Sequence, residues 1–252
     1  MSPWALLPHF LGLGAQKAGT TTLHVWLSSH PRVHLPVGKE LHYFTLFYSR
    51  GPDWYAKQFS AAGPGQRCGD ITPYYLFHPA APGRIKDLLP EIRLIVLLRD
   101  PVERTLSGLF HSLRLGLEPL PLEQALAAEE QRLAVAEALL LAGKAEHHSH
   151  QVHSYLSRSR YEHQLERYEG LFPPHQLLVA RSEDLFTAPE RLWPRLLTFL
   201  ELPQVPPPLH LPRENSGHGE ARNIDPALRE CLRHSLASTY DAMEQRYGLR
   251  WP

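Results

Sequence analysis

Apolar residues occur along this chain in two patterns, short continuous runs and longer stretches with helical spacing. The continuous runs predict strands of a parallel sheet that helices cover on both faces, because such strands are apolar without alternation; they are His9–Leu13, Leu94–Leu98 and Leu177–Ala180. Helical spacing follows in Thr20–Ser29, Pro101–Leu115, Leu122–Ala142, Tyr161–Phe172, Pro189–Leu200 and Pro226–Tyr247. Strand, turn and helix in this recurring order predict an α/β doubly wound sheet.

The charge balance of the chain limits the classes of binding partner that can be expected. The 252 residues include 26 Lys and Arg against 26 Asp and Glu, so the formal net charge is zero. A neutral chain lacks the positive field that holds nucleic acid or an anionic membrane, and no nucleic-acid partner is expected.

No apolar stretch is long enough to span a bilayer, and Leu6–Leu13 lacks the flanks of a signal peptide. We therefore expect a cytoplasmic or otherwise soluble protein, while an anchor lost by truncation stays open. Cys68 and Cys231 fit neither a disulfide framework nor a zinc pattern.

A glycine-rich turn follows the first predicted strand, in the sequence FLGLGAQKAGTTT. Backbone N–H groups and the helix dipole at a helix N-terminus attract anions. Gly14 and Gly19 would let the backbone wrap an oxyanion closely, while Lys17 adds a positive charge and Thr20 and Thr21 add hydroxyl donors. The order Lys-x-Gly-Thr-Thr differs from the Gly-Lys-Ser/Thr of nucleotide hydrolases. The alternative, a glycine turn without a chemical role, does not explain a lysine beside threonines after a buried strand.

A second polar cluster follows the strand LIVLL. Arg99 stands at the carboxyl edge of that strand, where open α/β sheets bind ligands. Asp100 and Pro101 then predict a helix start, with Asp as N-cap and Pro at the first helical position. Ser107 lies eight residues after Arg99 on that helix. A guanidinium with a hydroxyl suits a terminal phosphate, although Arg99 could instead pair with a nearby acid such as Glu103.

Together these segments resemble the two cofactor-binding motifs of the sulfotransferases that use 3′-phosphoadenosine 5′-phosphosulfate (PAPS). The segments KELHYF, DWYAKQF, GDITPYYLF and RSRYEHQLERYEGLFP are similar to the heparan sulfate (carbohydrate) branch, and the likeness runs from about Phe10 to Leu200. The resemblance implies a P-loop-like three-layer α/β fold with a central, mostly parallel sheet flanked by helices, in a single sulfotransferase domain over residues 1–252. It also implies that PAPS is the sulfuryl donor and that no metal is needed. The 3′-phosphate would then be held by Arg99 and Ser107, and the 5′-phosphosulfate by the loop residues Gln16, Lys17, Ala18, Gly19, Thr20 and Thr21.

The resemblance assigns the chemistry to three residues. Glu40 stands where that branch carries its catalytic glutamate and would take the proton from an acceptor hydroxyl or amine as general base. Lys17 would neutralise the oxygen that bridges sulfur and the leaving bisphosphate. His42 is a second base or an orienter, or else a polar neighbour without a role; in an extended segment Glu40 and His42 would share a face. The alternative for Glu40 is a surface pair with Lys39 or Arg50.

Several positions depart from the branch or add to it. Ile71 replaces a lysine that the branch often has before Thr-Pro, and SGHGEARNIDP replaces its basic C-terminal loop, so that Arg222 or His218 would take that part. An enzyme for a densely anionic polymer needs a basic groove, so Ile71 and the zero net charge indicate a smaller or neutral acceptor, a carbohydrate or a small molecule. Ser159 and Tyr161 fall where the family contacts its cofactor.

Two other classes stay open beside a sulfotransferase. A P-loop nucleotide kinase would use ATP and magnesium, but the chain lacks Gly-Lys-Ser/Thr. A non-catalytic nucleotide-binding protein of the same fold would not need Lys17 and Glu40. Outside the motifs, we expect a solvated loop or a lid over the acceptor pocket, more than a metal site, from His147, His148, His150 and His153. We expect a solvated helix face from Glu129, Glu130 and Glu137.

Overall fold

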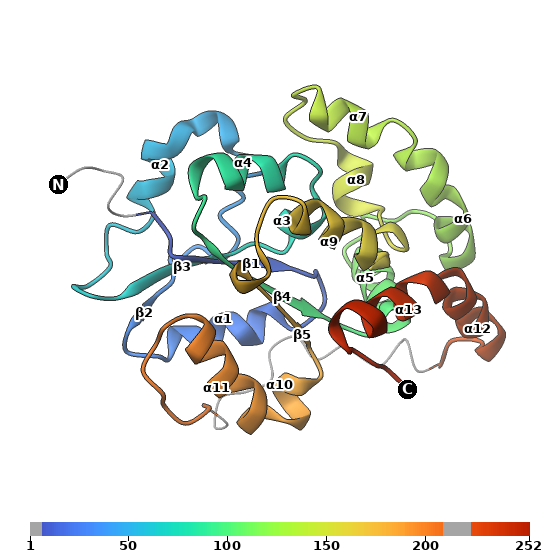
Figure 1. The fold of residues 1–252 in the computed structure, drawn as a ribbon. Helices are drawn as coiled ribbons and strands as arrows, with labels where there is room; N and C mark the ends of the chain where they lie inside the picture. The colour runs from blue at the N-terminus through green and yellow to red at the C-terminus, as the bar shows by residue number, and fades with distance from the viewer. Residues whose placement is uncertain (1–6, 209–222) are drawn as a thin grey trace.

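The fold is built on one sheet of five parallel strands, as a computed structural model that describes residues 7–208 and 223–252 shows (Figure 1). The strand order is β2-β3-β1-β4-β5, and every neighbouring pair is parallel. The strands are β1 (Phe10–Gly14), β2 (Val33–His34), β3 (Arg67–Ile71), β4 (Arg93–Leu98) and β5 (Leu177–Arg181). The predicted α/β fold with a parallel sheet is confirmed.

Helices cover both faces of the sheet. In Figure 1, α1 and α11 lie on one face, and α2 and α4 lie on the other. The helices are α1 (Thr20–Ser28), α2 (Gly51–Lys57), α3 (Tyr74–Phe77), α4 (Ala81–Leu88), α5 (Pro101–Arg114), α6 (Leu122–Leu133), α7 (Ala136–Leu141), α8 (His148–Val152), α9 (Tyr161–Glu169), α10 (Asp184–Thr187), α11 (Pro189–Phe199), α12 (Pro226–Ser235) and α13 (Ala237–Tyr247). Short 3₁₀ turns lie at η2 (Tyr48–Arg50), η3 (Ser157–Ser159) and η4 (Pro174–Gln176).

Strands β2 and β3 were not predicted, and several helix boundaries differ from the prediction. Strand β3 was not predicted because its residues RCGDI do not form an apolar run, although four of the five are buried. Gly69 in β3 is required by packing, since a Cβ there would lie 2.1 Å from the ring of Phe10. The predicted helix Leu122–Ala142 is divided into α6 and α7, and the predicted helix Pro226–Tyr247 is divided at the buried Leu236 into α12 and α13.

The sheet brings three loops to one edge. Strands β1, β3 and β4 are neighbours, and the carboxyl ends of parallel strands meet at the same edge of a sheet. The loop after β1 leads into α1, Thr72 follows β3, and Arg99 follows β4. Segments that are distant in the sequence therefore face one region, which is where open α/β sheets bind ligands.

Candidate active site

The loop between β1 and α1 has the backbone that the glycine-rich sequence predicts. Gly14 has φ 142°, Lys17 has φ 69°, and Gly19, the N-cap of α1, has φ 76°. A Cβ at Gly14 would lie 2.9 Å from the carbonyl oxygen of Pro73, so only glycine fits at that position. No side chain of the described residues caps α1. The positive end of the helix dipole at this terminus can therefore attract an anion.

Positive charge gathers around this loop although the molecule as a whole is neutral. Lys17 is half-buried, and Nη1 of Arg99 lies 3.4 Å from its carbonyl oxygen. Burial lowers the pKa of Lys17, and the nearby charges of Arg114, Arg99, Arg104 and Lys39 lower it further. A bound anion would relieve this mutual repulsion. The loop and its cations thus fit an anionic donor such as PAPS.

The second predicted cluster lies beside the first. Asp100 caps α5 by accepting a hydrogen bond from the backbone N–H of Glu103, as predicted. Nη2 of Arg99 also lies 3.6 Å from a carboxylate oxygen of Glu103, so the alternative pairing that the sequence left open is present as a long, half-exposed contact. The hydroxyl of Tyr161 donates to the carbonyl oxygen of Arg99 at 2.9 Å and fixes the end of β4. Ser107 is half-buried on α5.

Three further residues were predicted near the cofactor, and the structure describes one of them, Ser159. Ser159 is buried, and its Oγ lies 2.6 Å from Nε of Arg104 and 2.7 Å from Oγ1 of Thr105. Its hydroxyl is therefore engaged with α5. Arg222 and His218 lie outside the described residues, and their part in a C-terminal loop stays a prediction.

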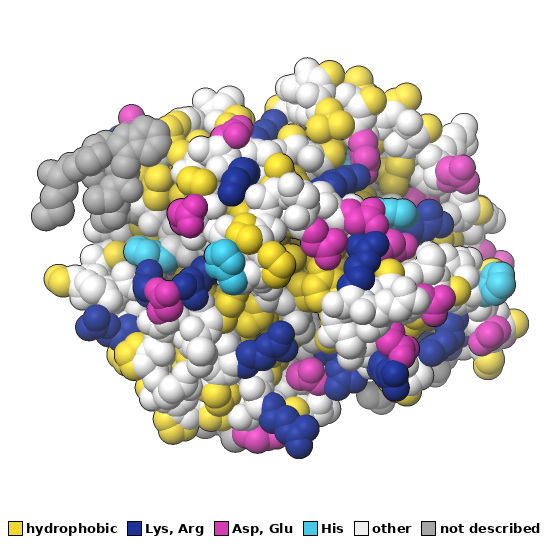
Figure 2. Space-filling model, in the orientation of Figure 1, with side chains coloured by type: hydrophobic (Ala, Val, Ile, Leu, Met, Phe, Trp, Pro, Cys, Tyr) yellow, Lys and Arg dark blue, Asp and Glu magenta, His cyan; other side chains and the backbone are white. Residues whose placement is uncertain are grey.

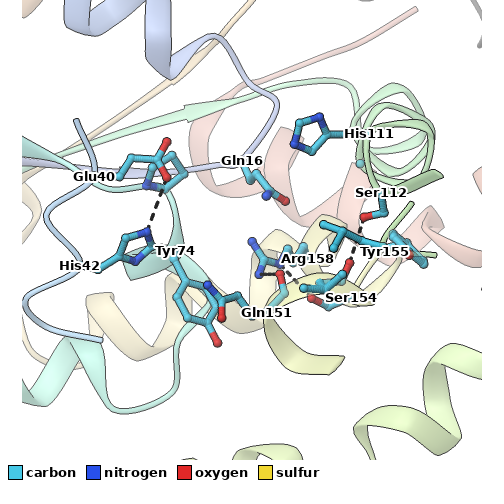
Figure 3. Close-up of a pocket in the computed structure, with 14 residues that line it drawn as sticks. Gln16, Glu40, His42, Tyr74, His111, Ser112, Gln151, Ser154, Tyr155 and Arg158 are labelled. Atoms are coloured by element: carbon cyan, nitrogen blue, oxygen red, sulfur yellow. Dashed lines mark hydrogen bonds and ion pairs between the residues drawn. The ribbon is translucent and has the colours of Figure 1, made fainter. Parts of the chain in front are cut away.

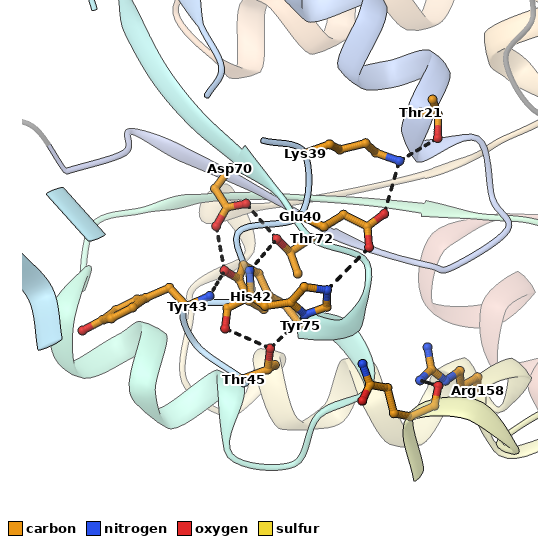
Figure 4. A network of polar contacts seen from close by, with 11 residues as sticks. Thr21, Lys39, Glu40, His42, Tyr43, Thr45, Asp70, Thr72, Tyr75 and Arg158 are labelled. Carbon is orange, nitrogen blue, oxygen red and sulfur yellow. Dashed lines mark hydrogen bonds and ion pairs between the residues drawn. The ribbon is translucent and has the colours of Figure 1, made fainter. Parts of the chain in front are cut away.

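Glu40 lies between two positively charged or protonatable side chains (Figure 4). Its carboxylate is 3.2 Å from Nζ of Lys39 and 3.6 Å from Nε2 of His42. Glu40 and His42 have φ of 65° and 52°, so the segment is not extended, and a left-handed backbone brings the two side chains together. Burial raises the pKa of Glu40, but His42 and Lys39 outweigh it and hold that pKa below its usual value. Glu40 is therefore ionised at neutral pH and can accept a proton.

The surface pair that the sequence left as an alternative for Glu40 is present only in part. Lys39 does pair with Glu40, but it also donates to Oγ1 of Thr21 at 2.6 Å and so links Glu40 to the helix that follows the loop. Arg50 instead lies over the rings of Phe47 and Trp54, at 4.6 and 4.9 Å from their centroids.

A buried carboxylate that sequence analysis missed supports this segment. Asp70, at the end of β3, accepts hydrogen bonds from the hydroxyls of Tyr55, Thr72 and Tyr75 at 2.9, 2.8 and 2.6 Å. The backbone N–H of His42 in turn lies 3.5 Å from Oγ1 of Thr72. Burial raises the pKa of Asp70 above its usual value. The network anchors the Glu40–His42 segment to the sheet edge (Figure 4).

A cavity of about 170 Å³ connects the loop to the carboxylate of Glu40 (Figure 3). Its wall is mainly polar and includes Gln16, Glu40, His42, His111, Gln151 and Arg158. Burial lowers the pKa of His111, as do the charges of Lys17 and Arg114, so this ring is neutral near pH 7. Among the predicted residues, Gln16 of the loop and the pair Glu40 and His42 thus share one space. No local sequence signal pointed to His111, Gln151 or Arg158.

The histidine-rich patch is not the solvated loop that the sequence predicted. Its middle part forms α8 (His148–Val152); His150 in that helix and His153 directly after it are 1% and 8% exposed. His150 Nδ1 lies 2.8 Å from the hydroxyl of Tyr74, and His153 Nε2 lies 3.0 Å from the carbonyl oxygen of Leu117. The segment does border the cavity, through Gln151. Within residues 7–208 and 223–252, no group of three or more His, Cys, Asp or Glu side chains could hold a metal ion.

Comparison with known proteins identifies the family. The family model for the sulfotransferase domain matches residues 7–213, and the chain therefore belongs to the sulfotransferase family of enzymes. Membrane-associated sulfotransferase kil1 of Dictyostelium discoideum is 39% identical over 111 residues, which are 43% of this chain and 24% of that protein. Human heparan sulfate glucosamine 3-O-sulfotransferase 3B1 is 28% identical over 200 residues, which are 79% of this chain and 47% of that protein.

A solved structure covers the whole fold. The crystal structure of a sulfotransferase from Alicyclobacillus acidocaldarius superimposes with a TM-score of 0.78 at 25% identity, over 97% of each chain. The resemblance to PAPS-dependent enzymes of the carbohydrate branch is confirmed by these relatives. The chain spans less than half the length of the two curated relatives named above. In the part of the chain that the structure describes, none of the helices has the length and apolarity to cross a bilayer.

Proposed function

We propose that this chain transfers the sulfuryl group of PAPS to a hydroxyl or amine of a carbohydrate or small-molecule acceptor. The observation that carries the proposal is that Gln16 of the anion loop and the ionised Glu40 line the same cavity. Sulfuryl transfer is an in-line displacement, so the attacking nucleophile and the leaving bisphosphate must lie on opposite sides of sulfur. A space bordered by both the loop and a proton acceptor meets that requirement.

The loop side would hold the donor, which supplies an activated sulfuryl group. The N–H groups at the start of α1 and the hydroxyls of Thr20 and Thr21 would bind the 5′-phosphate, and Arg99 with Ser107 would bind the 3′-phosphate. Lys17 would meet the charge that grows on the bridging oxygen. Such fixed positive charge accelerates transfer because its interaction strengthens in the transition state.

The other side would hold the acceptor. Glu40 would take the proton from the attacking hydroxyl or amine, in the ionised state that Lys39 and His42 maintain. His42 is itself held by Oγ1 of Thr45, which lies 3.2 Å from its Nδ1. His42 would therefore act as an orienter of Glu40, which supports Glu40 as the base.

Labelled transfer tests the proposal. The protein would be incubated with sulfur-labelled PAPS and a panel of sugars, phenols and alkyl alcohols. Glu40→Gln keeps the size of the side chain but cannot accept the proton, so we expect turnover to fall by at least about 100-fold with near-normal donor affinity. His42→Ala is the companion variant. If His42→Ala is inactive while Glu40→Gln keeps its activity, the base is the histidine.

Binding of the product separates this proposal from its two alternatives. We expect the 3′,5′-bisphosphate to bind in the presence of a chelator, because the described clamps consist of cations, hydroxyls and backbone N–H groups. A strict need for a divalent ion, or transfer from ATP, would replace the proposal with a kinase. Tight binding without transfer to any acceptor in the panel would indicate a non-catalytic nucleotide-binding protein.

A further inference from the structure

Arg158 is a buried cation in the wall of the cavity. It belongs to η3, and only 4% of the residue is exposed. Figure 3 shows it on the other side of the drawn pocket from Glu40 and His42. Taking a guanidinium out of water costs free energy, so the groups around it must compensate.

The partners of Arg158 that the described residues supply are all neutral. Its Nε donates to Oγ of Ser154 at 2.8 Å, and its Nη2 donates to the carbonyl oxygens of His150 and Gln151 at 3.2 and 2.8 Å. The guanidinium also lies 4.9 Å from the ring centroids of Tyr74 and Phe77. Within the described residues, no carboxylate forms an ion pair with this side chain. The positive charge is held in place but is not neutralised.

One nitrogen of the guanidinium, Nη1, can still donate a hydrogen bond to a ligand. Nη1 has no acceptor among the described residues, yet it is not sealed from solvent as the unpartnered Nη1 of Arg104 is. Because Arg158 lines the cavity, its Nη1 is open to that space. Burial lowers the pKa of Arg158 only to about 10, so the side chain remains a cation at neutral pH. The cavity therefore has a negative side at Glu40 and a positive side at Arg158.

We propose that Arg158 selects an acceptor with one carboxylate, bound at Nη1, and a hydroxyl that faces Glu40. A carboxylate is a planar acceptor that suits a guanidinium, and Glu40 would repel it toward the opposite wall. The cavity of about 170 Å³ is smaller than the roughly 300–1,000 Å³ of drug-sized ligand sites and suits a single ring, such as a hexuronic acid. This inference rests on the proposed function. It refines the expected small acceptor to one that carries a single negative charge.

Two matched acceptors test the inference. Methyl β-glucuronide and methyl β-glucoside differ only in a carboxylate in place of a hydroxymethyl group. We expect the wild-type protein to have a kcat/KM about 10- to 100-fold higher for the glucuronide, the range of a charge-assisted hydrogen bond. Arg158→Gln should lower the glucuronide value to that of the glucoside, and Arg158→Lys should recover part of the preference. Arg160→Gln, which changes an exposed arginine two residues away, should leave the preference intact.

Other outcomes overturn the inference. Equal kcat/KM for the two glycosides in the wild-type protein would do so even if Arg158→Gln fails to fold. An equal loss for both acceptors in Arg158→Gln, without recovery in Arg158→Lys, would show a purely structural residue. If no sulfate is transferred to any acceptor, the proposed function fails separately. Saturation-transfer NMR with the bisphosphate-loaded protein then still decides the charge preference, and equal binding or no binding of the glycosides rejects it.

Discussion

At the scale of single residues, Lys39 connects the two halves of the site. Its Nζ lies 2.6 Å from the Thr21 hydroxyl on α1 and 3.2 Å from the Glu40 carboxylate. One cation thus contacts both a residue of the donor loop and the proposed base. The KELHYF motif indicated Glu40, but the sequence presented Lys39 only as a surface partner, because its contact with Thr21 depends on the fold.

Replacing Lys39 should change the pH dependence of transfer. Lys39 is one of the groups that hold the pKa of Glu40 below its usual value, so Lys39→Met removes an opposite charge and raises that pKa. Glu40 must be ionised to accept a proton. The acid limb of the kcat/KM profile should therefore move to higher pH, with activity largely recovered on the alkaline side. Lys57→Met, at an exposed lysine of α2, is the control. An acid limb that does not move in Lys39→Met would mean that Lys39 does not act on the base.

Replacing the two cations of the proposed donor site, Arg99 and Lys17, should give different kinetic effects. Arg99→Ala would remove the charge-assisted contact to the 3′-phosphate that we propose, so bisphosphate affinity should fall by about 1.5–3 kcal/mol, as calorimetry would measure. Lys17→Ala removes charge that matters most in the transition state, so kcat should fall more than donor affinity. If both variants changed only the Michaelis constant, the role given to Lys17 would be wrong.

At the scale of elements, the predictable parts of the site are those with local signals. The loop after β1 and the start of α5 have glycine, proline and capping residues in a fixed order, and both formed as expected. Arg158 and Asp70 had no such signal, because their partners come from other elements, such as Tyr74 for Arg158 and Tyr55 for Asp70. Strand β3 was not predicted for the same reason, because the polar Asp70 can be buried only through its tertiary hydrogen bonds.

The expectation that Glu129 belongs to a solvated helix face is wrong. Only 4% of Glu129 is exposed, and it joins α6 to the turn that contains Arg158. Its carboxylate accepts from the backbone N–H groups of Leu156 and Ser157, both at 2.8 Å, and from the Ser157 hydroxyl at 2.6 Å. The neighbouring Glu130 is exposed as predicted. Successive helical residues point in different directions, so two adjacent glutamates have different roles.

Removing the Glu129 carboxylate should weaken this connection. Glu129→Ala leaves buried donors at η3 unsatisfied, so the free energy of unfolding should fall by about 1–3 kcal/mol in a urea titration. Glu130→Ala is matched in position and chemistry and should change stability by at most about 0.5 kcal/mol. Equal effects of the two substitutions would contradict a capping role for Glu129.

At the scale of the whole molecule, positive and negative charges balance, while several cations lie close together at one loop. On the face in Figure 2, Lys and Arg side chains are interspersed with Asp and Glu, without one continuous basic groove. The cations that depress the pKa of Lys17 instead gather around the loop after β1. The zero net charge favours a small acceptor over a densely anionic polymer, in agreement with the Nη1 of Arg158 proposed above to bind one carboxylate.

Buried histidines should make the whole molecule sensitive to acid. His78 and His150 are each 1% exposed and lie beside Tyr74. Burial, together with nearby arginines such as Arg158, lowers the pKa of His78 to about 3 and that of His150 to about 2. In the unfolded chain both rings take up a proton near their ordinary value of 6.5. Between these limits the unfolded state binds more protons, so the free energy of unfolding falls as the pH falls.

Urea titrations across this range measure the effect. Each of the two histidines should add a slope approaching about 1.4 kcal/mol per pH unit below pH 6.5, and neither adds a slope above it. Asp70, whose pKa is raised, acts in the opposite direction, because its folded form takes up a proton before its unfolded form does.

His150→Gln should lower stability at neutral pH, since its contact with Tyr74 changes, but should flatten the slope below pH 6.5. His175→Gln, at an exposed histidine, should leave the slope unchanged. A slope in His150→Gln as steep as that of the wild-type protein would show that His150 is not the neutral buried group assigned here.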